Sequence, residues 1–297
     1  MSTNDPAIER ETKQILRQIQ NHLCETHVAY GAVKEMAGMM DVYHHPTSKI
    51  STLNYITPRR NTAYVSRIYI EQGLEVLTQL ERTQRVVYVD GLYPPQFAKS
   101  LRELGLQMER ETPIMVYKPG GIQGLWQPPP LVERALPDGI SIKQVSDQEG
   151  IGQWWYVWRN GHYDVLTLGV EPLFVGKDME ANWLGRQMDY VLYRSGFPAG
   201  VVRVSMIQET AHILAMALLK EIRSPAMIQI LQMAAVKGAL DKGARLIFAP
   251  GEQEAERRMA RELGFMDFGN IICYSAAEEA ARGNDAHSME LSVFAFS

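Results

Sequence analysis

Three side chains in the second half of the chain have the chemistry of a general base. Glu209 and His212 lie at the start of an apolar run over residues 212–219, and Glu221 lies just after its end. A carboxylate or imidazole can take a proton from an attacking nucleophile when it lies within one hydrogen bond, or one water, of the attacking atom. Glu221 is the strongest candidate because it separates a predicted strand from a predicted helix. All three residues are also typical of solvated turns or strand edges.

The residues after Glu221 have the composition of an anion-binding helix start. Ser224 and Pro225 predict an N-cap and a first-turn proline, and apolar residues at helical spacing continue until Lys242 and Gly243. The unpaired N–H groups of a first helical turn, together with the positive end of the helix dipole, attract phosphate. The candidate ligand-binding residues at this junction are Leu219, Arg223, Ser224, Ala226, Met227 and Ile228. A structural helix that is simply well capped is the alternative.

A succession of strands and helices must position these groups. Apolar patterning predicts strands over residues 200–207 and 212–219, the helix from Ser224, and a further strand over residues 245–249. A helix over residues 171–186 and a strand over residues 189–193 precede them. The segment over residues 154–164 is rich in aromatic and polar side chains, which suits either a core or the wall of an acceptor pocket.

The first half of the chain predicts similar elements with less regularity. Helical periodicity runs over residues 8–39, strands are predicted near residues 50–56 and 63–69, and a helix follows over residues 72–80. At 297 residues the chain is long enough for two domains. Glycines and three consecutive prolines interrupt regular structure over residues 118–130. We therefore predict a first domain over residues 1–119, a linker over 120–136 and a second domain over 137–297.

A repeat indicates that the two domains are copies of one unit. The sequence LRELGL at residues 101–106 matches ARELGF at residues 260–265. Both matches lie between two predicted strands, over residues 85–89 and 113–117 in the first copy and over residues 245–249 and 270–274 in the second. A glycine that caps a helix in the left-handed conformation explains Gly105 and Gly264 singly. It does not explain why the surrounding strands and helices recur in the same order.

The order strand, strand, capped helix, strand, helix, Leu-Gly-Phe, strand resembles the GCN5-related N-acetyltransferase (GNAT) superfamily, clearly over residues 139–274 and weakly over residues 63–117. The resemblance implies an α+β fold in α/β/α layers, built as two tandem domains, each with a mostly antiparallel mixed sheet flanked by helices. It also implies that the strand before the main helix splays from its neighbour, and that a glycine-rich loop at the helix start holds the pyrophosphate of acetyl-CoA or another acyl-CoA. That loop falls on residues 223–228, where Ser224, Ala226 and Ile228 replace the usual glycines.

The tyrosine that this family often uses as a general acid is also missing. Its position falls on Ala260 in the second copy and on Leu101 in the first. Tyr163, Tyr190 or Tyr193 could replace it in space. These departures from the family pattern leave two readings open, an active transferase and a protein that has kept the fold and lost the chemistry.

Composition excludes several other classes of function. A net charge of -4 and the lack of a basic block argue against nucleic acid as a partner. No apolar run is long enough to cross a membrane and no signal peptide is evident, so a cytoplasmic location is expected. Cys24 and Cys273 read as buried reduced thiols, and the adjacent histidines His44 and His45 lack the spacing of a metal site, so no metal is expected.

The resemblance therefore implies an acyl-CoA-dependent N-acyltransferase, with acetyl as the expected acyl group, that acts on a small amine by direct transfer. The other reading is a catalytically inactive GNAT-like protein that binds acyl-CoA or regulates a partner. Residues 57–61 add a turn with two guanidinium groups, which suits an anionic ligand or a solvated charged turn. The acceptor, the acyl length and the formation of a homodimer are left open.

Overall fold

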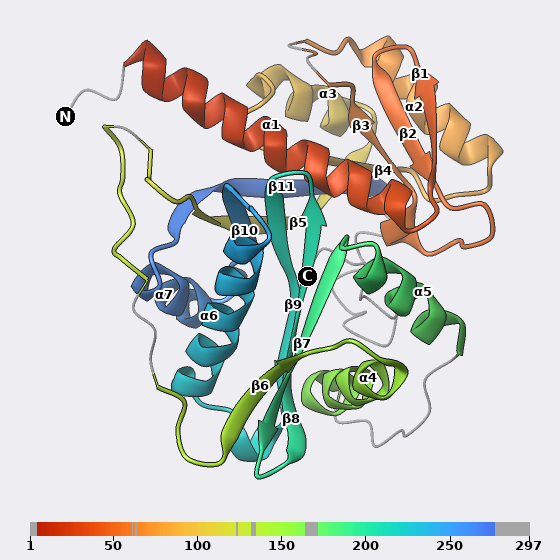
Figure 1. Cartoon of the computed structure of the whole chain (residues 1–297). Coiled ribbons are helices and arrows are strands. Elements are labelled where there is room, and N and C mark those ends of the chain that lie inside the picture. Colours follow the sequence, from red (N-terminus) through yellow and green to blue (C-terminus); the bar gives the residue numbers. More distant parts are fainter. Residues whose placement is uncertain are drawn as a thin grey trace. The chain divides into compact units, whose positions relative to one another are not determined.

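A computed structural model describes residues 5–60, 62, 64–122, 124–131, 135–163 and 172–276. The chain forms two compact units. The first comprises Met1–Ile114 together with Phe268–Ser297, and the second comprises Met115–Asp267. The first unit is therefore discontinuous in sequence, because the last described strand, residues 266–276 (blue in Figure 1), lies mostly in it.

The first unit orders its strands β1-β2-β3-β4-β11-β5. Its helices are α1 (Pro6–Ala29), the 3-10 turn η1 (Ser51–Leu53), α2 (Arg67–Gln79) and α3 (Pro95–Glu103). Its strands are β1 (Val33–Ala37), β2 (Met40–His44), β3 (Tyr55–Pro58), β4 (Arg85–Val89), the larger parts of β5 (Leu106–Tyr117) and β11 (Met266–Ala276). Strands β3 and β4 are parallel, whereas β1 with β2, β2 with β3 and β4 with β11 are antiparallel.

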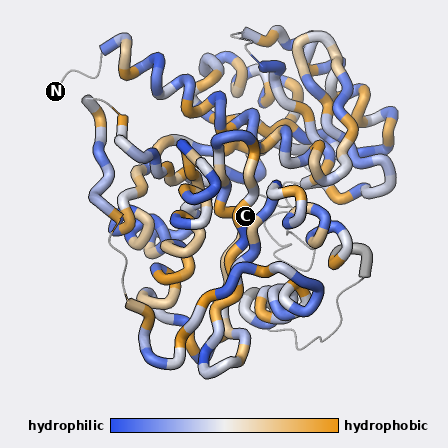
Figure 2. The backbone as a smooth tube through the Cα atoms, viewed as in Figure 1, coloured by the Kyte–Doolittle hydropathy of each residue, from blue (hydrophilic) through white to orange (hydrophobic). Residues whose placement is uncertain are grey.

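Helices cover both faces of this sheet. Ile70 and Leu74 of α2 and Phe97 of α3 pack with Val42, Ile56 and Val86 in one buried cluster. Alternate strand residues face α1 instead, where His27 meets the ring of Tyr55 edge-on. Helix α1 mixes hydrophilic and hydrophobic residues along its length, as an amphipathic helix with one solvated face does (Figure 2).

The second unit orders its strands β10-β9-β8-β7-β6, with the last residues of β5 beside β10. Its strands are β6 (Ile140–Gln144), β7 (Gln187–Arg194), β8 (Phe197–Ile207), β9 (Thr210–Leu218) and β10 (Leu246–Pro250). Its helices are α4 (Gln148–Tyr163), α5 (Pro172–Trp183), the 3-10 turn η2 (Lys220–Ile222), α6 (Pro225–Asp241) and α7 (Glu254–Glu262). Strands β9 and β10 are parallel, and β6 to β9 pair antiparallel.

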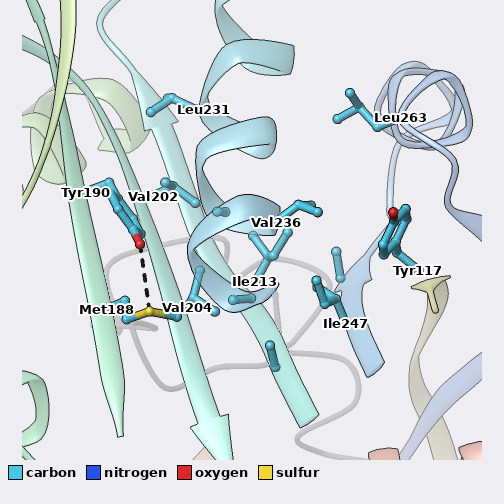
Figure 3. Close-up of a cluster of buried hydrophobic side chains, with 14 of the residues drawn as sticks. Tyr117, Met188, Tyr190, Val202, Val204, Ile213, Leu231, Val236, Ile247 and Leu263 are labelled. Carbon is cyan, nitrogen blue, oxygen red and sulfur yellow. Dashed lines mark hydrogen bonds between the residues drawn. The ribbon is translucent and has the colours of Figure 1, made fainter. Parts of the chain in front are cut away.

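Two helical layers enclose this second sheet. Val202 and Val204 of β8 lie in the same buried cluster as Leu231 and Val236 of α6 (Figure 3). Arg203, between them in sequence, points to the other face, where its guanidinium group lies over the ring of Trp154 of α4. This alternation is what a strand buried on both faces requires. The predicted fold class, an α+β protein with layered helices and mostly antiparallel mixed sheets, is confirmed.

The structure adds a pairing that the repeat does not reveal. Strand β11 follows α7 in sequence, yet it pairs antiparallel with β4 of the first unit, with Ile271 opposite Val89. Gly105 and Gly264 both have positive φ, 83° and 90°, just after α3 and α7, as the left-handed caps predicted. We propose that the two copies of the repeat correspond to the domains predicted over residues 1–119 and 137–297, joined by a linker over residues 120–136.

Two predicted elements of the first half are wrong. Helical periodicity predicts a helix to residue 39, but α1 ends at Ala29, and residues 33–44 form the hairpin of β1 and β2. Gly31 and Gly38 adopt positive φ of 96° and 59°, which ends the helix and turns the hairpin. Residues 64–66, predicted as part of a strand, lead into α2 without regular structure, and Ser66 is the N-cap residue.

Within the described part of the chain, every helix is too short or too polar to cross a lipid bilayer.

Candidate functional site

The two parallel strands of the second unit separate part-way along their length. Strands β9 and β10 are in register at three pairs, Leu246 with Thr210, Ile247 with Ala211 and Phe248 with His212. Strand β9 continues to Leu218, where it remains paired with Gly200 of β8. Residues 213–218 of β9 therefore have β8 on one side and no register pair with β10 on the other.

A β-bulge coincides with the start of this separation. Arg203 of β8 lies opposite Ala215, and Val204 lies opposite Ile213, so Leu214 is the extra residue on β9. A bulge bends its strand and increases the local twist. Because the extra residue Leu214 lies two residues after His212, the last β9 residue that pairs with β10, the bulge accounts for the direction in which β9 leaves β10.

Helix α6 starts close to the end of β9, after the single turn η2. Ser224 is its N-cap residue and Pro225 its first residue, as predicted. The Oγ atom of Ser224 accepts a hydrogen bond from the N–H of Met227 at 3.4 Å, and its carbonyl accepts from the N–H of Ile228 at 3.1 Å. Pro225 has no N–H group. Ala226 is therefore the residue of this first turn whose N–H is left for a ligand.

The preceding turn uses other amides internally. The N–H of Ile222 donates to the carbonyl of Leu219 at 3.1 Å, and the N–H of Arg223 donates to the carbonyl of Lys220 at 3.3 Å. Leu219 in turn donates to Ala199 at 2.9 Å. The junction thus offers fewer backbone donors to an anion than an open glycine-rich loop would.

Arg223 ties the end of β9 to the end of α4. Its Nη2 atom donates to the carbonyl of Leu218 at 3.2 Å and also to the carbonyl of Gly161. A Cβ atom on Gly161 would lie 2.9 Å from the carbonyl oxygen of Leu218, so only glycine permits this approach. The positive charge of Arg223 therefore stays at the mouth of the separated strands.

Ile228 lies beside the helix start. Together with Leu219, Ile222 and Met227 it is partly buried and packs against the apolar cluster between α6 and the sheet. Figure 3 shows Ile213 of β9, Val236 of α6 and Ile247 of β10 in this cluster. The predicted ligand-binding residues thus lie together at one end of β9.

The three predicted bases do not lie together. Glu221 is exposed in η2, beside the start of α6. Glu209 is in the turn at the opposite end of β9, where its carboxylate pairs with Arg245 at 3.1 Å. Nine residues of strand separate the two, which corresponds to about 27 Å. One site can use Glu221 or Glu209, but not both.

His212 is enclosed within the sheet. Its side chain is 3% exposed, and its ring stacks on that of Phe248 with centroids 4.2 Å apart. Burial lowers the pKa of His212 to about 3, so the imidazole is neutral at physiological pH and a weak base. This environment suits a core residue.

The two positions at which the GNAT superfamily often has a tyrosine are buried in this protein. Ala260 is 4% exposed and Leu101 is fully buried. Tyr190 contacts α6 at Gly238, which lies roughly 20 Å along the helix axis from Pro225. Tyr193 lies two strands from Leu218 at the same end of the sheet, and its hydroxyl donates to Gln153. The side chain of Tyr163 lies outside the described residues.

Sequence reasoning missed a buried charge cluster on the face of α4 and α5. Arg203, fully buried, donates to Asp189 through Nε at 2.7 Å and through Nη2 at 3.0 Å, and Nη2 also reaches Asp178 at 2.7 Å. Trp155 donates to the same oxygen of Asp178 at 2.8 Å. Gln187 donates to Asp189 at 2.8 Å. The cluster fixes α4 and α5 on β7 and β8.

A signal for this cluster exists in the sequence. Asp189 and Arg203 each interrupt an apolar strand, and opposite charges in neighbouring buried strands must pair. The register that places them directly opposite each other comes only from the structure.

A metal centre has no support in the described residues, where no three His, Cys, Asp or Glu side chains converge as ligands. The His44 ring instead contacts the carboxylate of Glu35 at 2.9 Å.

No protein-family model matches this sequence, and no curated protein matches it closely enough to be a relative. Solved structures do match the fold. A GCN5-related N-acetyltransferase from Kribbella flavida superposes with a TM-score of 0.70 at 14% identity, covering 89% of this chain and 96% of that one. A tandem GNAT protein from the clavulanic acid biosynthesis pathway gives a TM-score of 0.58 at 15% identity, covering 93% and 96%.

A third match is the C-terminal domain of a putative lysylphosphatidylglycerol synthetase from Agrobacterium fabrum, with a TM-score of 0.50 at 11% identity, covering 95% of both chains. At these identities the matches establish the fold. The separated strands β9 and β10, the helix α6 that follows β9, and the two similar units agree with it. The chain therefore has the GNAT fold in a tandem arrangement.

Proposed function

We propose that this protein transfers an acyl group from acyl-CoA, acetyl-CoA being the first donor to test, to a small amine. The observation that carries the proposal is the separation of β9 from β10 after His212 and Phe248, with the start of α6 at its mouth. The separation leaves the edge of residues 213–218 for the amides of an extended donor, and the positive end of α6 faces the place where its diphosphate would lie.

Different residues at the opening between β9 and β10 would bind the donor and accept the proton. The N–H of Ala226 and the guanidinium group of Arg223 would bind phosphate oxygens. The thioester supplies the activated acyl group when the donor is bound. Glu221 would accept the proton of the attacking amine, because it is the candidate carboxylate at this end of β9.

The raised pKa values of both thiols in this chain favour direct attack by the amine over an acyl-cysteine intermediate. Burial raises the pKa of Cys24, and it raises the pKa of Cys273 to about 11. Neither thiol is ionised near neutral pH, so neither is suited to carry the acyl group. The proposal places the protein in the cytoplasm, where both thiols stay reduced.

A second function has an observation in its favour, namely binding of acyl-CoA without turnover. The amides of Ile222, Arg223, Met227 and Ile228 are already bonded within the chain, and Ala260 is buried at the position of the missing acid. A site with few donors and no general acid would act as a sensor of the thioester.

Two measurements on the full chain separate these functions. The first is thermal unfolding with and without acetyl-CoA, where ligand at 100 times its dissociation constant adds about 2.7 kcal/mol of stability. The second is thiol release from acetyl-CoA with a panel of small amines. Stabilisation with thiol release supports the transferase, and stabilisation without it supports the sensor. If no acyl-CoA stabilises the protein, both proposals fail.

The same panel should include lysine derivatives and lipid amines, since the matched structures carry names that imply different acceptors. Light scattering on the same samples tests the homodimer.

A further inference from the structure

The first unit contains a pocket that the proposed transferase site does not use. It has a volume of about 480 Å³ and lies where α1 meets the carboxyl ends of the parallel strands β3 and β4. Thr57 and Pro58 end β3 at its wall, and Gly91 and Leu92 follow β4. Small-molecule sites in α/β sheets commonly lie outside the carboxyl ends of parallel strands, and they commonly have volumes in the range of about 300–1,000 Å³.

This pocket is lined by four cationic side chains and by the carboxylates of Glu25 and Asp41. Lys13 and Arg17 come from α1, Lys34 comes from β1, and Arg60 follows β3. Lys13 is paired with Glu9 at 2.6 Å. Arg17 and Arg60 are exposed, and the structure shows no carboxylate bonded to either within the described residues. Guanidinium groups from two different elements in the lining of one pocket suit a carboxylate, which each can bind through parallel hydrogen bonds.

A buried carboxylate lines the same pocket. Asp41 is 5% exposed, and its Oδ2 atom pairs with Lys34 at 2.9 Å. Its Oδ1 atom is buried and accepts no hydrogen bond, and Nε of Arg59 lies 3.6 Å from it. A buried carboxylate oxygen without a donor is costly. An ammonium group bound beside Asp41 would supply that donor once the carboxylate turns toward the pocket.

Other residues of the lining are held by contacts within the first unit. Gln20 donates to Thr57 at 3.0 Å and accepts from the N–H of Val89 at 2.7 Å, which fixes its amide. The ring of Tyr43 stacks on Tyr55 with centroids 5.3 Å apart. The unsatisfied acceptor of Asp41 and the guanidinium groups of Arg17 and Arg60 are the features from which we infer the ligand.

We propose that this pocket binds a small amino-carboxylate, with its ammonium group at Asp41 and its carboxylate between Arg17 and Arg60. The inference does not depend on the transferase site at α6, because every residue of the pocket belongs to the first unit.

The test is calorimetric titration of the full chain with matched probes. The panel contains the standard L-amino acids and γ-aminobutyrate. Each binder is compared with the analogue that lacks its amine and with the analogue that lacks its carboxylate. We expect at least one amino-carboxylate to bind, and each of its two analogues to bind about tenfold more weakly or less, as the loss of a charge-assisted hydrogen bond implies. Equal binding of the deaminated analogue would overturn the proposal, as would the absence of binding by every member of the panel or tight binding of CoA in place of them.

Variants locate the binding within the chain. Arg17→Gln and Arg60→Gln change exposed side chains, so they should fold normally and each weaken binding about tenfold. Arg67→Gln makes the same charge change on α2, where Arg67 pairs with Glu71 outside the pocket, and should bind as the parent does. Asp41→Asn should make each amino-carboxylate and its analogue without the amine bind equally. Ala226→Glu, at the start of α6, should leave this binding unchanged, so that failure here and failure of the transferase are separable.

Discussion

The rings of His212 and Phe248 lie nearly parallel, 8° apart with centroids separated by 4.2 Å, at the last register pair between β9 and β10. The stacked pair lies at the end of the segment over which the two strands are paired. Beyond it, the bulge at Leu214 turns β9 away from β10. The opening on which the proposed function depends therefore begins at a fixed point in the sheet.

The buried imidazole of His212 predicts a loss of stability in acid. Burial lowers its pKa from 6.5 to about 3. Below pH 6.5 the unfolded chain therefore binds a proton that the folded chain does not bind until about pH 3, and the folded state loses stability as the pH falls. His212→Gln removes this titration. Between pH 7 and pH 4 the variant should lose about 3 kcal/mol less of its free energy of unfolding than the parent loses. Guanidinium unfolding at both pH values measures this difference.

His27 of the first unit gives an independent check. Burial also lowers its pKa to about 3, with the charge of Arg85 as a second cause. His27→Gln should reduce the acid loss by a similar amount. If neither variant changes the difference between pH 7 and pH 4, both imidazoles are accessible to protons in the folded state, and the enclosed environment described for His212 is wrong.

Ala226→Glu tests the start of α6 as an anion site. A carboxylate in the first turn interacts favourably with the positive end of the helix dipole, so the variant should fold with unchanged or slightly higher stability. The same charge repels a diphosphate, and the affinity for acetyl-CoA should fall at least about tenfold. Thermal unfolding and calorimetry on one sample separate the two effects.

Lys99→Gln is the matched control for this substitution. It makes the same change in net charge on α3, where Lys99 is 70% exposed and lies 3.7 Å from Glu103. Acetyl-CoA should bind this variant as it binds the parent. An Ala226→Glu variant that also retains parental affinity would place the donor elsewhere.

Glu221→Gln tests the assignment of the base. Loss of a general base costs about 10²- to 10⁴-fold in turnover, whereas donor binding at Arg223 and Ala226 should be retained. Glu209→Gln, at the other end of β9, removes an exposed pair with Arg245 and should leave turnover unchanged. The reverse result, with Glu209 essential, would move the reaction to the opposite end of the strand.

Local signals in the sequence predicted the elements around the site correctly. Ser224 and Pro225 start α6, and Lys242 with Gly243 ends it, because caps depend on neighbours in the chain. The same reasoning placed β8, β9 and β10 within a few residues. It failed over residues 30–40, where helical periodicity continued past Gly31 into a hairpin.

Strand partners could not be predicted in this way. The apolar run of β11 gives no indication that it pairs with β4 rather than with a strand of its own copy. The bulge at Leu214 and the register between Asp189 and Arg203 are equally non-local. The amides bonded inside η2 and α6 also follow from three-dimensional geometry, and they decide how many donors remain for a ligand.

The buried cluster around Arg203 gives a prediction about stability. One guanidinium group lies between two carboxylates, so Arg203→Met leaves Asp178 and Asp189 buried without a cation. Breaking a buried pair in this way costs about 3–5 kcal/mol. Asp178→Asn leaves the bidentate pair of Arg203 with Asp189 intact and keeps an acceptor for Trp155, so it should cost clearly less. Urea unfolding of the two variants ranks them, and a larger loss for Asp178→Asn than for Arg203→Met would show that the charge balance of the cluster differs from the one inferred from its contacts.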